Sequence, residues 1–193
     1  MDHSLMYFST EMTIVFVVDL NKAYGQTFIH DDRFLATLAS VTAIFNALGR
    51  PVWGTLADKL GFMPTLLTTQ ALLASAAATL LVTEYLGRWA FSGWVCAMYL
   101  AISGIYALEP SLTFALFGAR NFTTNLGIVR CSGILSSLLS VFVAAAAKEA
   151  FGYHGIFLAG ATCTLLGMII NASLLVRCGH PLPEHMQREL FKN

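Results

Sequence analysis

Long apolar stretches alternate with short polar stretches along almost the whole chain. A transmembrane helix needs about 20 predominantly apolar residues, and six stretches approach or exceed that length. The predicted spans are residues 5–20, 34–57, 63–82, 89–108, 126–147 and 155–176. The first span is the weakest because Glu11 and Asp19 interrupt it. The pattern predicts an all-α membrane protein with six transmembrane helices.

The first predicted connection is a polar stretch over residues 21–33. Six spans in succession predict one transmembrane domain over residues 1–177, with both termini on the same side of the membrane. Residues 178–193 contain two prolines, several charges and little periodicity, so we expect a solvated tail. No basic residue precedes the first apolar stretch, so we expect no cleaved secretory signal.

The composition agrees with a membrane environment. Of the 193 residues, 56% are hydrophobic and 11% are charged, and the mean hydropathy is +0.68. Soluble domains contain about 25% charged residues, so this chain has too few to cover a globular surface, and its outer face must meet lipid. The alternative is a soluble helical bundle with a large core. The formal net charge is zero, which gives a nucleic-acid partner no electrostatic support.

The residue types that enzymes and metal sites need are not grouped in the sequence. There is no H-x-x-x-H pair, no glycine-rich phosphate loop and no G-x-S-x-G element. The four cysteines form no C-x-x-C pair and are expected to act as small hydrophobic residues. We expect all histidines to be solvated in loops and termini; they are His3, His30, His154, His180 and His185. The sequence therefore predicts no enzymatic activity, no cofactor and no metal.

Arg50 is the best-placed charged residue within the predicted spans. A charge at membrane depth costs about 2.5 kcal/mol or more, so it normally faces protein or water. Asn46 lies four residues earlier on the same helical face, and Pro51 removes a backbone donor next to Arg50. A guanidinium suits a carboxylate because its planar fork donates two parallel hydrogen bonds. The alternative is that Arg50 snorkels to the membrane surface or ties helices together.

Three further charges lie at or near membrane depth. Arg130 falls in the first turns of the fifth span, where it either adds a second anion contact or snorkels. Glu109 precedes Pro110, at which we expect the fourth span to kink. Glu109 either titrates in a proton-coupled cycle or pairs with an arginine, and Glu11 presents the same two alternatives.

Small and aromatic residues indicate how the spans pack. Alanine-rich runs at residues 74–78 and 144–147 predict close contacts between helices. Aromatic residues near the predicted span ends are typical of interfacial belts; they are Trp53, Tyr85, Trp89, Phe151 and Tyr153.

Four segments resemble a known transporter family. Residues 54–61 are similar to the G-x-x-x-D-[RK]-x-G loop signature of the major facilitator superfamily, carried here by Gly54, Asp58 and Gly61. The other segments resemble the C-terminal half of the oxalate/formate antiporter and monocarboxylate transporter branch, to which plant nodulin-like proteins are also similar. They are residues 19–26, 45–54 and 116–127. The sequence departs from the signature at Phe62 and Met63, because basic residues usually follow its second glycine.

The resemblance implies that the six spans correspond to helices seven to twelve of a twelve-helix fold. In that branch an arginine of the eighth helix contacts the substrate carboxylate, and this position falls on Arg50. Antiporter relatives also use a lysine of the eleventh helix; its position is Gly133, and Arg130 lies one turn earlier. The loop signature is cytoplasmic in proteins that have it, which implies cytoplasmic termini and a cytoplasmic tail.

These expectations combine into a secondary transporter, or its C-terminal half, that moves a small carboxylate by alternating access. Arg50, Arg130 and Asn46 are the predicted substrate-binding residues, and Glu109 and Glu11 are candidates for coupling. A lone half provides one wall of the cavity, so we expect a missing N-terminal half or an oligomeric partner. The alternative is a non-transporting membrane interaction protein, or a truncated fragment that pairs with another transporter half. A six-helix channel is less favoured because the sequence has no selectivity-filter element.

Overall fold

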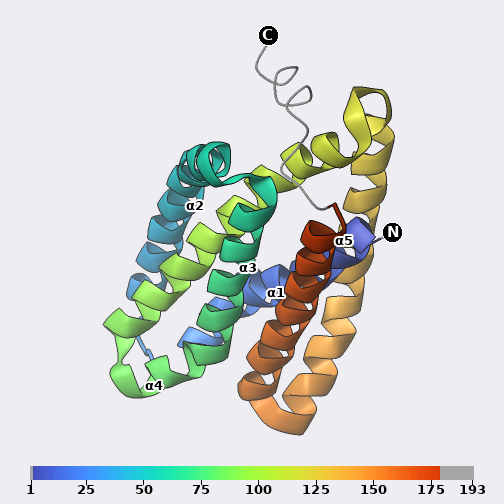
Figure 1. Ribbon diagram of the computed structural model, residues 1–193. Coiled ribbons are helices and arrows are strands. Elements are labelled where there is room, and N and C mark those ends of the chain that lie inside the picture. Colours follow the sequence, from blue (N-terminus) through green and yellow to red (C-terminus); the bar gives the residue numbers. More distant parts are fainter. Residues whose placement is uncertain (1, 179–193) are drawn as a thin grey trace.

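The computed structural model describes residues 2–178, which are almost entirely helical (Figure 1). The elements are α1 (Asp2–Gly25), α2 (Asp32–Leu60), α3 (Phe62–Thr79), a 3-10 turn η1 (Leu80–Val82), α4 (Thr83–Leu86) and α5 (Arg88–Cys178). No strand occurs among these residues. The predicted tail lies outside the described residues except for its first residue, Cys178.

Helix α5 changes direction twice along its length. Its 91 residues would extend about 137 Å if the helix were straight. The backbone is non-helical at Gly118 (φ 70°, ψ 169°) and at Gly152 (φ 64°, ψ −153°). Glycine tolerates positive φ because it has no Cβ. The two glycines divide α5 into a first segment (88–117), a second segment (119–151) and a third segment (153–178), as Figure 1 shows.

The structure therefore contains five α-helices among the described residues, not the six separate helices that we expected. The last three expected spans are joined within α5 because each reversal takes a single glycine instead of a loop. The helix also continues past residue 108 and through Pro110, and the kink that we expected there stays a prediction. The first non-helical backbone geometry within α5 lies at Gly118.

Four helical stretches are long and apolar enough to cross a membrane; they are Asp32–Leu60, Phe62–Leu86, Arg88–Ala150 and Gly152–Ser173. Helix α1 is not among them, in agreement with its interruption by Glu11 and Asp19. The Arg88–Ala150 stretch, with 63 residues, contains the Gly118 reversal. It is much longer than the hydrocarbon core of a bilayer requires. The number of membrane crossings stays a prediction.

Side chains and glycines define both ends of α2. The Asp31 carboxylate accepts a hydrogen bond from the Phe34 N–H at 3.0 Å and caps the start of the helix. Helix α1 continues to Gly25, so the first connection is shorter than the predicted stretch 21–33. At the other end, Gly61 has φ 92° and ψ 156°, and its N–H donates to the Ala57 carbonyl at 2.8 Å. The glycine of the predicted loop signature thus occupies a conformation that other residues avoid.

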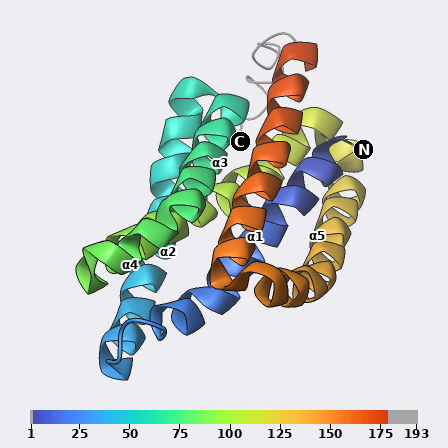
Figure 2. The same cartoon turned by 90° about the horizontal axis from the view of Figure 1, so that it is seen from below.

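The helices form two groups that are joined by α1 (Figures 1 and 2). Helices α2 and α3 pack with the first segment of α5, where the Trp53 indole N–H donates to the Leu100 carbonyl at 2.8 Å. Helix α1 lies along the other two segments: Ser136 donates to the Phe8 carbonyl at 2.7 Å, and Thr13 to the Gly160 carbonyl at 2.5 Å. Trp53 is buried, so its assignment to an interfacial belt was wrong. It lies on the face of α2 that packs on α5.

Close helix contacts depend on glycine and alanine, although not everywhere that the sequence indicated. A Cβ at Gly49 would lie 2.0 Å from the Ser103 hydroxyl oxygen, and one at Gly104 would lie 2.5 Å from Thr69 Cγ2. The first alanine-rich run contributes buried Ala74, Ala76 and Ala77. The second run is only partly packed, because Ala145 and Ala146 are exposed.

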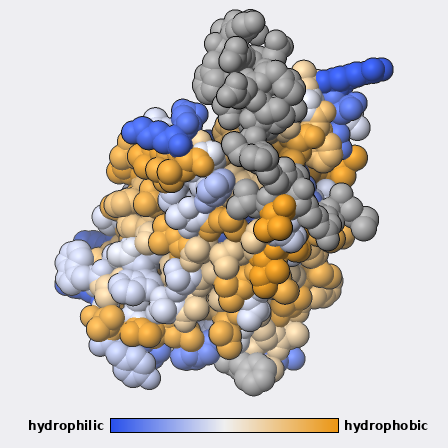
Figure 3. Space-filling model, in the orientation of Figure 1, coloured by the Kyte–Doolittle hydropathy of each residue, from blue (hydrophilic) through white to orange (hydrophobic). Residues whose placement is uncertain are grey.

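The outer surface carries many large apolar side chains. Examples are Ile44, Leu48 and Val52 on α2, and Leu135, Leu138 and Phe142 on the second segment of α5. Apolar residues cover much of the face that Figure 3 shows. A soluble monomer rarely exposes such large apolar patches. A lipid environment accounts for this surface.

Candidate functional site

Arg50 lies on α2 at the margin of the face that packs into the bundle. The buried residues of this helix are Leu35, Leu38, Thr42, Gly49, Trp53 and Ala57. Arg50 follows Gly49 directly, so it is rotated by about 100° from the packed face, and its side chain is exposed. Among the side chains that the structure describes, no carboxylate lies within ion-pair distance of its guanidinium. Arg50 therefore presents an uncompensated positive charge.

Asn46 lies beside Arg50 on the same helix, as the sequence indicated. Its side-chain oxygen Oδ1 is buried and makes no hydrogen bond to the described residues. Residues four apart lie above one another on a helix. Pro51 is part of α2 and offers no N–H to the carbonyl one turn earlier. Polar groups without partners are thus concentrated in this part of α2.

Arg130 has a different environment, because its guanidinium is already engaged. Arg130 Nη2 lies 2.6 Å from Glu109 Oε2, and Nη1 donates to the Tyr7 hydroxyl at 2.7 Å. The guanidinium also lies 5.4 Å from the ring centre of Tyr7 and 5.8 Å from that of Tyr106. The Arg130 side chain is 41% exposed, whereas that of Glu109 is 0% exposed. The geometry thus shows Glu109 paired with an arginine, one of the two alternatives from the sequence.

Glu11 completes this group from α1. Its Oε1 accepts a hydrogen bond from the Tyr106 hydroxyl at 2.9 Å, and its Oε2 is buried without a partner among the described residues. We call Tyr7, Glu11, Tyr106, Glu109 and Arg130 the ion-pair cluster. It joins α1 to the first and second segments of α5. Asp19, the other acid of α1, is exposed and takes no part.

The structure explains why a glycine occupies the position at which the resemblance places a lysine. A Cβ at Gly133 would lie 2.8 Å from Tyr7 Cε1 and 3.6 Å from Glu11 Cγ. The Tyr7 ring therefore fills the space that a longer side chain would need. Arg130, one turn earlier, supplies a cation to the same region.

Sequence reasoning missed several members of these groups. Tyr7 lies four residues before Glu11, and Tyr106 lies three residues before Glu109, so helical spacing could have placed each tyrosine beside an acid on the same helix. The Tyr106 hydrogen bond to Glu11 joins different helices and has no such local signal. His3 was expected in solvent, but it is 3% exposed, and its Nε2 lies 2.9 Å from the Thr113 hydroxyl oxygen. That prediction was wrong because α1 begins at Asp2 and packs against α5 from its first turn.

No hydrogen bond or ion pair of the described residues joins Arg50 to Arg130. Their expected convergence on one cavity stays a prediction. In the loop signature, Gly61 has the positive φ described above, and Asp58 is exposed in the last turn of α2. A Cβ at Gly54 would meet no atom within 4 Å, so packing within this chain does not require that glycine.

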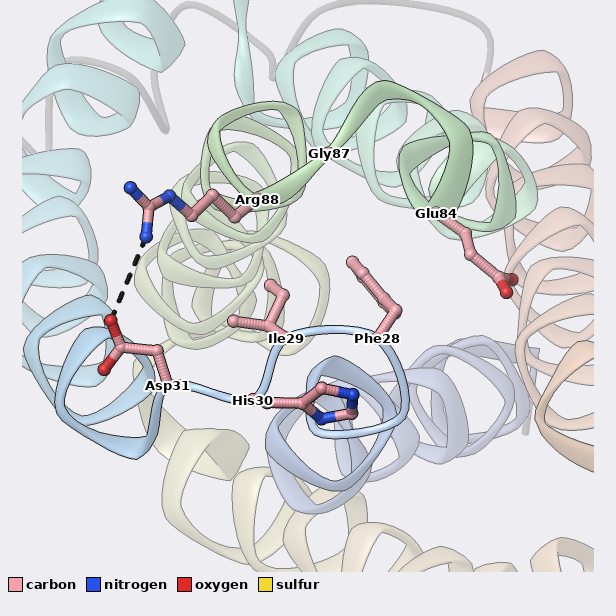
Figure 4. Close-up of a pocket in the computed structure, with 7 residues that line it drawn as sticks. All are labelled: Phe28, Ile29, His30, Asp31, Glu84, Gly87 and Arg88. Atoms are coloured by element: carbon pink, nitrogen blue, oxygen red, sulfur yellow. Dashed lines mark ion pairs between the residues drawn. The ribbon is translucent and has the colours of Figure 1, made fainter.

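A separate hollow of about 330 Å³ lies between the α1–α2 connection and the α4–α5 turn (Figure 4). Its lining residues are Phe28, Ile29, His30, Asp31, Glu84, Gly87 and Arg88. Arg88 reaches across to Asp31, with 3.9 Å between Nη1 and Oδ2, while Glu84 points away from this pair (Figure 4). None of the predicted site residues lines the hollow. No cluster of three or more potential metal ligands occurs among the side chains that are described.

Comparisons with known proteins agree with the membrane architecture. A family model described as the Major Facilitator Superfamily matches residues 3–189. The chain is 25% identical over 176 residues to an oxalate:formate antiporter of Oxalobacter formigenes, covering 91% of this chain and 42% of the antiporter. It is 26% identical over 141 residues to apicoplast pyruvate carrier 1 of Toxoplasma gondii, covering 73% of this chain and 26% of that carrier. The chain thus spans less than half the length of either relative. It is a multi-pass integral membrane protein that belongs to the major facilitator superfamily.

Proposed function

We propose that the chain acts as the C-terminal half of a carrier that moves a small carboxylate anion by alternating access. The names of the two relatives support a carboxylate, since one transports oxalate and formate and the other pyruvate. Three α5 segments together with α1, α2 and α3 would supply six crossings, half of a twelve-helix fold. Such carriers move two bundles around a central site.

The uncompensated charge of Arg50 is the observation that carries this proposal. An arginine without a carboxylate partner is costly in an apolar environment, so a ligand that neutralises it gains affinity. Asn46, whose side-chain oxygen has no partner among the described residues, lies one turn away and is suited to accept a hydrogen bond from a substrate hydroxyl or from water. Arg50 is therefore the principal anion contact in this proposal.

Arg130 would provide the second contact, in competition with Glu109. A substrate carboxylate that approaches the exposed side of Arg130 competes with Glu109 Oε2 for the same guanidinium. A buried carboxylate that loses its cation is unstable unless it takes up a proton. Glu109, with Glu11 nearby, is thus the candidate for coupling anion binding to proton uptake.

The other wall of the cavity would come from a second six-helix unit. Arg50 and the apolar residues Ile44 and Leu48 are exposed on α2. An N-terminal half or a second copy of the chain would cover part of this surface. The loop signature, with Gly54, Asp58 and Gly61, would brace the cytoplasmic gate between the two units.

Carboxylate flux into vesicles tests the role of Arg50. The chain is reconstituted together with the segment that supplies the second half, and Arg50→Lys is compared with the unaltered protein. Lysine keeps the charge but loses the bidentate fork, so we expect flux to fall while membrane insertion is unchanged. Arg33→Lys, also exposed on α2 but at its start, is the matched control and should retain flux. Equal flux in Arg50→Lys and unaltered protein would refute the assignment.

A second candidate function is that of a non-transporting partner that pairs with another transporter half. The partial coverage of both relatives and the exposed apolar face of α2 favour it. Crosslinking from a cysteine at Leu48 would detect pairing, and flux measurements would separate the two functions. Crosslinked complexes without carboxylate flux, in any combination of halves, would favour the second candidate.

A further inference from the structure

A chain of hydrogen-bonding side chains connects the first turn of α1 to the buried acid of the ion-pair cluster. His3 Nε2 lies 2.9 Å from Thr113 Oγ1. Thr113 Oγ1 lies 3.4 Å from Glu109 Oε1 and 2.9 Å from the Glu109 carbonyl oxygen. His3 is 3% exposed, and Thr113 and Glu109 are each 0% exposed. Three adjacent polar side chains are thus removed from solvent in one line.

The directions of these hydrogen bonds follow from the available protons. The single hydroxyl proton of Thr113 donates to the Glu109 carbonyl oxygen at 2.9 Å, and Glu109 Oε1, at 3.4 Å, is the second acceptor within its reach. Rotation of the hydroxyl turns this proton to Oε1 when the carboxylate is ionised. Thr113 Oγ1 can then accept a proton from His3 Nε2–H. His3 Nδ1 is buried and has no partner among the described residues. The line therefore ends at His3 in a buried nitrogen without a partner among the described residues, in the first turn of α1, and at Glu109 in the ion-pair cluster.

We propose that His3 and Thr113 form the route by which a proton reaches Glu109. A proton taken up at His3 Nδ1 gives an imidazolium. The imidazolium releases its Nε2 proton to Thr113 Oγ1, while Thr113 passes its own hydroxyl proton to Glu109 Oε1. His3 returns to a neutral imidazole, Thr113 remains a neutral hydroxyl, and Glu109 becomes a neutral carboxylic acid. No electron is transferred and no bond other than those to hydrogen changes.

The charged and polar groups around Glu109 determine how readily its carboxylate accepts a proton delivered by this route. Arg130 faces it from the second segment of α5, and Glu11 and Tyr7 face the same cluster from α1. Tyr106 lies one turn before Glu109 on the same helix, and its hydroxyl donates a hydrogen bond to Glu11. The arginine favours the carboxylate, whereas the second acid and the buried location oppose it. A proton on Glu109 removes its attraction for Arg130.

The consequence for transport rests on the proposed function, but the route itself does not. Protonated Glu109 would leave Arg130 free for a substrate carboxylate, so that one proton and one anion would enter the site together. Proton delivery can be measured without any substrate. Its failure would therefore be distinguishable from a failure of the carboxylate assignment.

Time-resolved infrared spectroscopy after a pH jump tests the route in the full chain reconstituted in lipid vesicles. The carbonyl stretch of the protonated carboxylic acid that disappears in Glu109→Gln is assigned to Glu109. Thr113→Val keeps the shape of the side chain but removes its hydroxyl, and His3→Gln keeps a nitrogen donor that cannot take up a proton. Both should slow protonation of Glu109 by about tenfold or more. Thr113→Ser, which keeps the hydroxyl, is the matched control and should respond at nearly the rate of the unaltered chain.

A purely structural role for these residues would shift the pH at which the band appears without slowing its appearance. Unchanged rates in Thr113→Val and His3→Gln would overturn the proposal. So would a Glu109 band that does not respond to pH in the unaltered chain. If Thr113→Val fails to insert or fold, the rate of Glu109 protonation in His3→Gln, compared with that in the unaltered chain, decides the outcome.

Discussion

The contact between Gly49 and Ser103 gives a quantitative test of how α2 is held against α5. In Gly49→Ala the new Cβ would lie 2.0 Å from Ser103 Oγ, 2.9 Å from Leu100 Cδ1 and 3.0 Å from Ser103 Cβ. Ordinary contacts begin near 3.4 Å, so the Ser103 hydroxyl must rotate away, and Ser103 Cβ, at 3.0 Å, still requires the two helices to separate locally by about 0.4 Å. Overpacking of this kind costs about 1–3 kcal/mol. Arg50, the next residue, would move with the displaced backbone.

A matched glycine on the same helix separates overpacking from helix propensity. Gly54 also lies inside α2, but a Cβ there would meet nothing within 4 Å. Gly54→Ala should therefore raise the free energy of unfolding by about 0.5–1 kcal/mol, the usual gain for alanine in a helix. In Gly49→Ala the same stabilisation from helix propensity is offset by the destabilisation that overpacking causes. Its free energy of unfolding should fall below that of Gly54→Ala by about 1–3 kcal/mol.

Ser103→Ala provides the second test, because it removes the hydroxyl that makes the shortest contact. In the double variant Gly49→Ala/Ser103→Ala, the shortest remaining contacts of the new Cβ at residue 49 are Leu100 Cδ1 at 2.9 Å and the Cβ of residue 103 at 3.0 Å. We expect Gly49→Ala to cost less than half as much in this background. Unfolding by denaturing detergent, followed by tryptophan fluorescence, measures all four combinations. Strictly additive effects, or equal stability of Gly49→Ala and Gly54→Ala, would refute the reasoning.

Two further predictions concern the turn after α2 and the ion-pair cluster. Gly61→Ala places a Cβ at φ 92° and ψ 156°, so the free energy of unfolding should fall by about 1–3 kcal/mol; an unchanged detergent midpoint would contradict this. Arg130→Ala leaves the buried Glu109 carboxylate without its cation, which should cost about 3 kcal/mol, near the lower limit for buried pairs because Arg130 is partly exposed. Addition of Glu109→Gln should restore most of that loss in the same unfolding measurement, whereas an equal loss in the double variant would exclude charge as its cause.

The sequence could predict features that depend on local chemistry. Apolar length identified the helical regions, because a segment that must satisfy its own backbone in lipid becomes a helix. The Asp31 cap and the positive φ of Gly61 at the ends of α2 were not predicted, although both act within a few residues and are accessible to local sequence reasoning. The sequence left two alternatives for Glu109, titration in a proton-coupled cycle or pairing with an arginine, and the structure pairs it with Arg130.

Other features depended on neighbours that are distant in the chain. The reversal at Gly118 lies beyond residue 108, where we expected the fourth span to end, and the sequence did not indicate it. Trp53 and His3 were judged from their positions near the ends of apolar stretches. Both are buried because segments more than 40 residues away in sequence cover them, at Leu100 and Thr113 respectively. Periodicity and composition carry no information about such partners.

The tight reversals at Gly118 and Gly152 have a practical consequence for mapping membrane topology. A Cβ at either glycine would meet no atom within 4 Å, so backbone geometry alone selects glycine there and the surroundings are open. Bulky hydrophilic reporters attached to residues beside these reversals should therefore be tolerated. We predict that the middle segment of α5 crosses the membrane, in which case reporters beside the two reversals would be accessible to membrane-impermeant reagents from opposite faces.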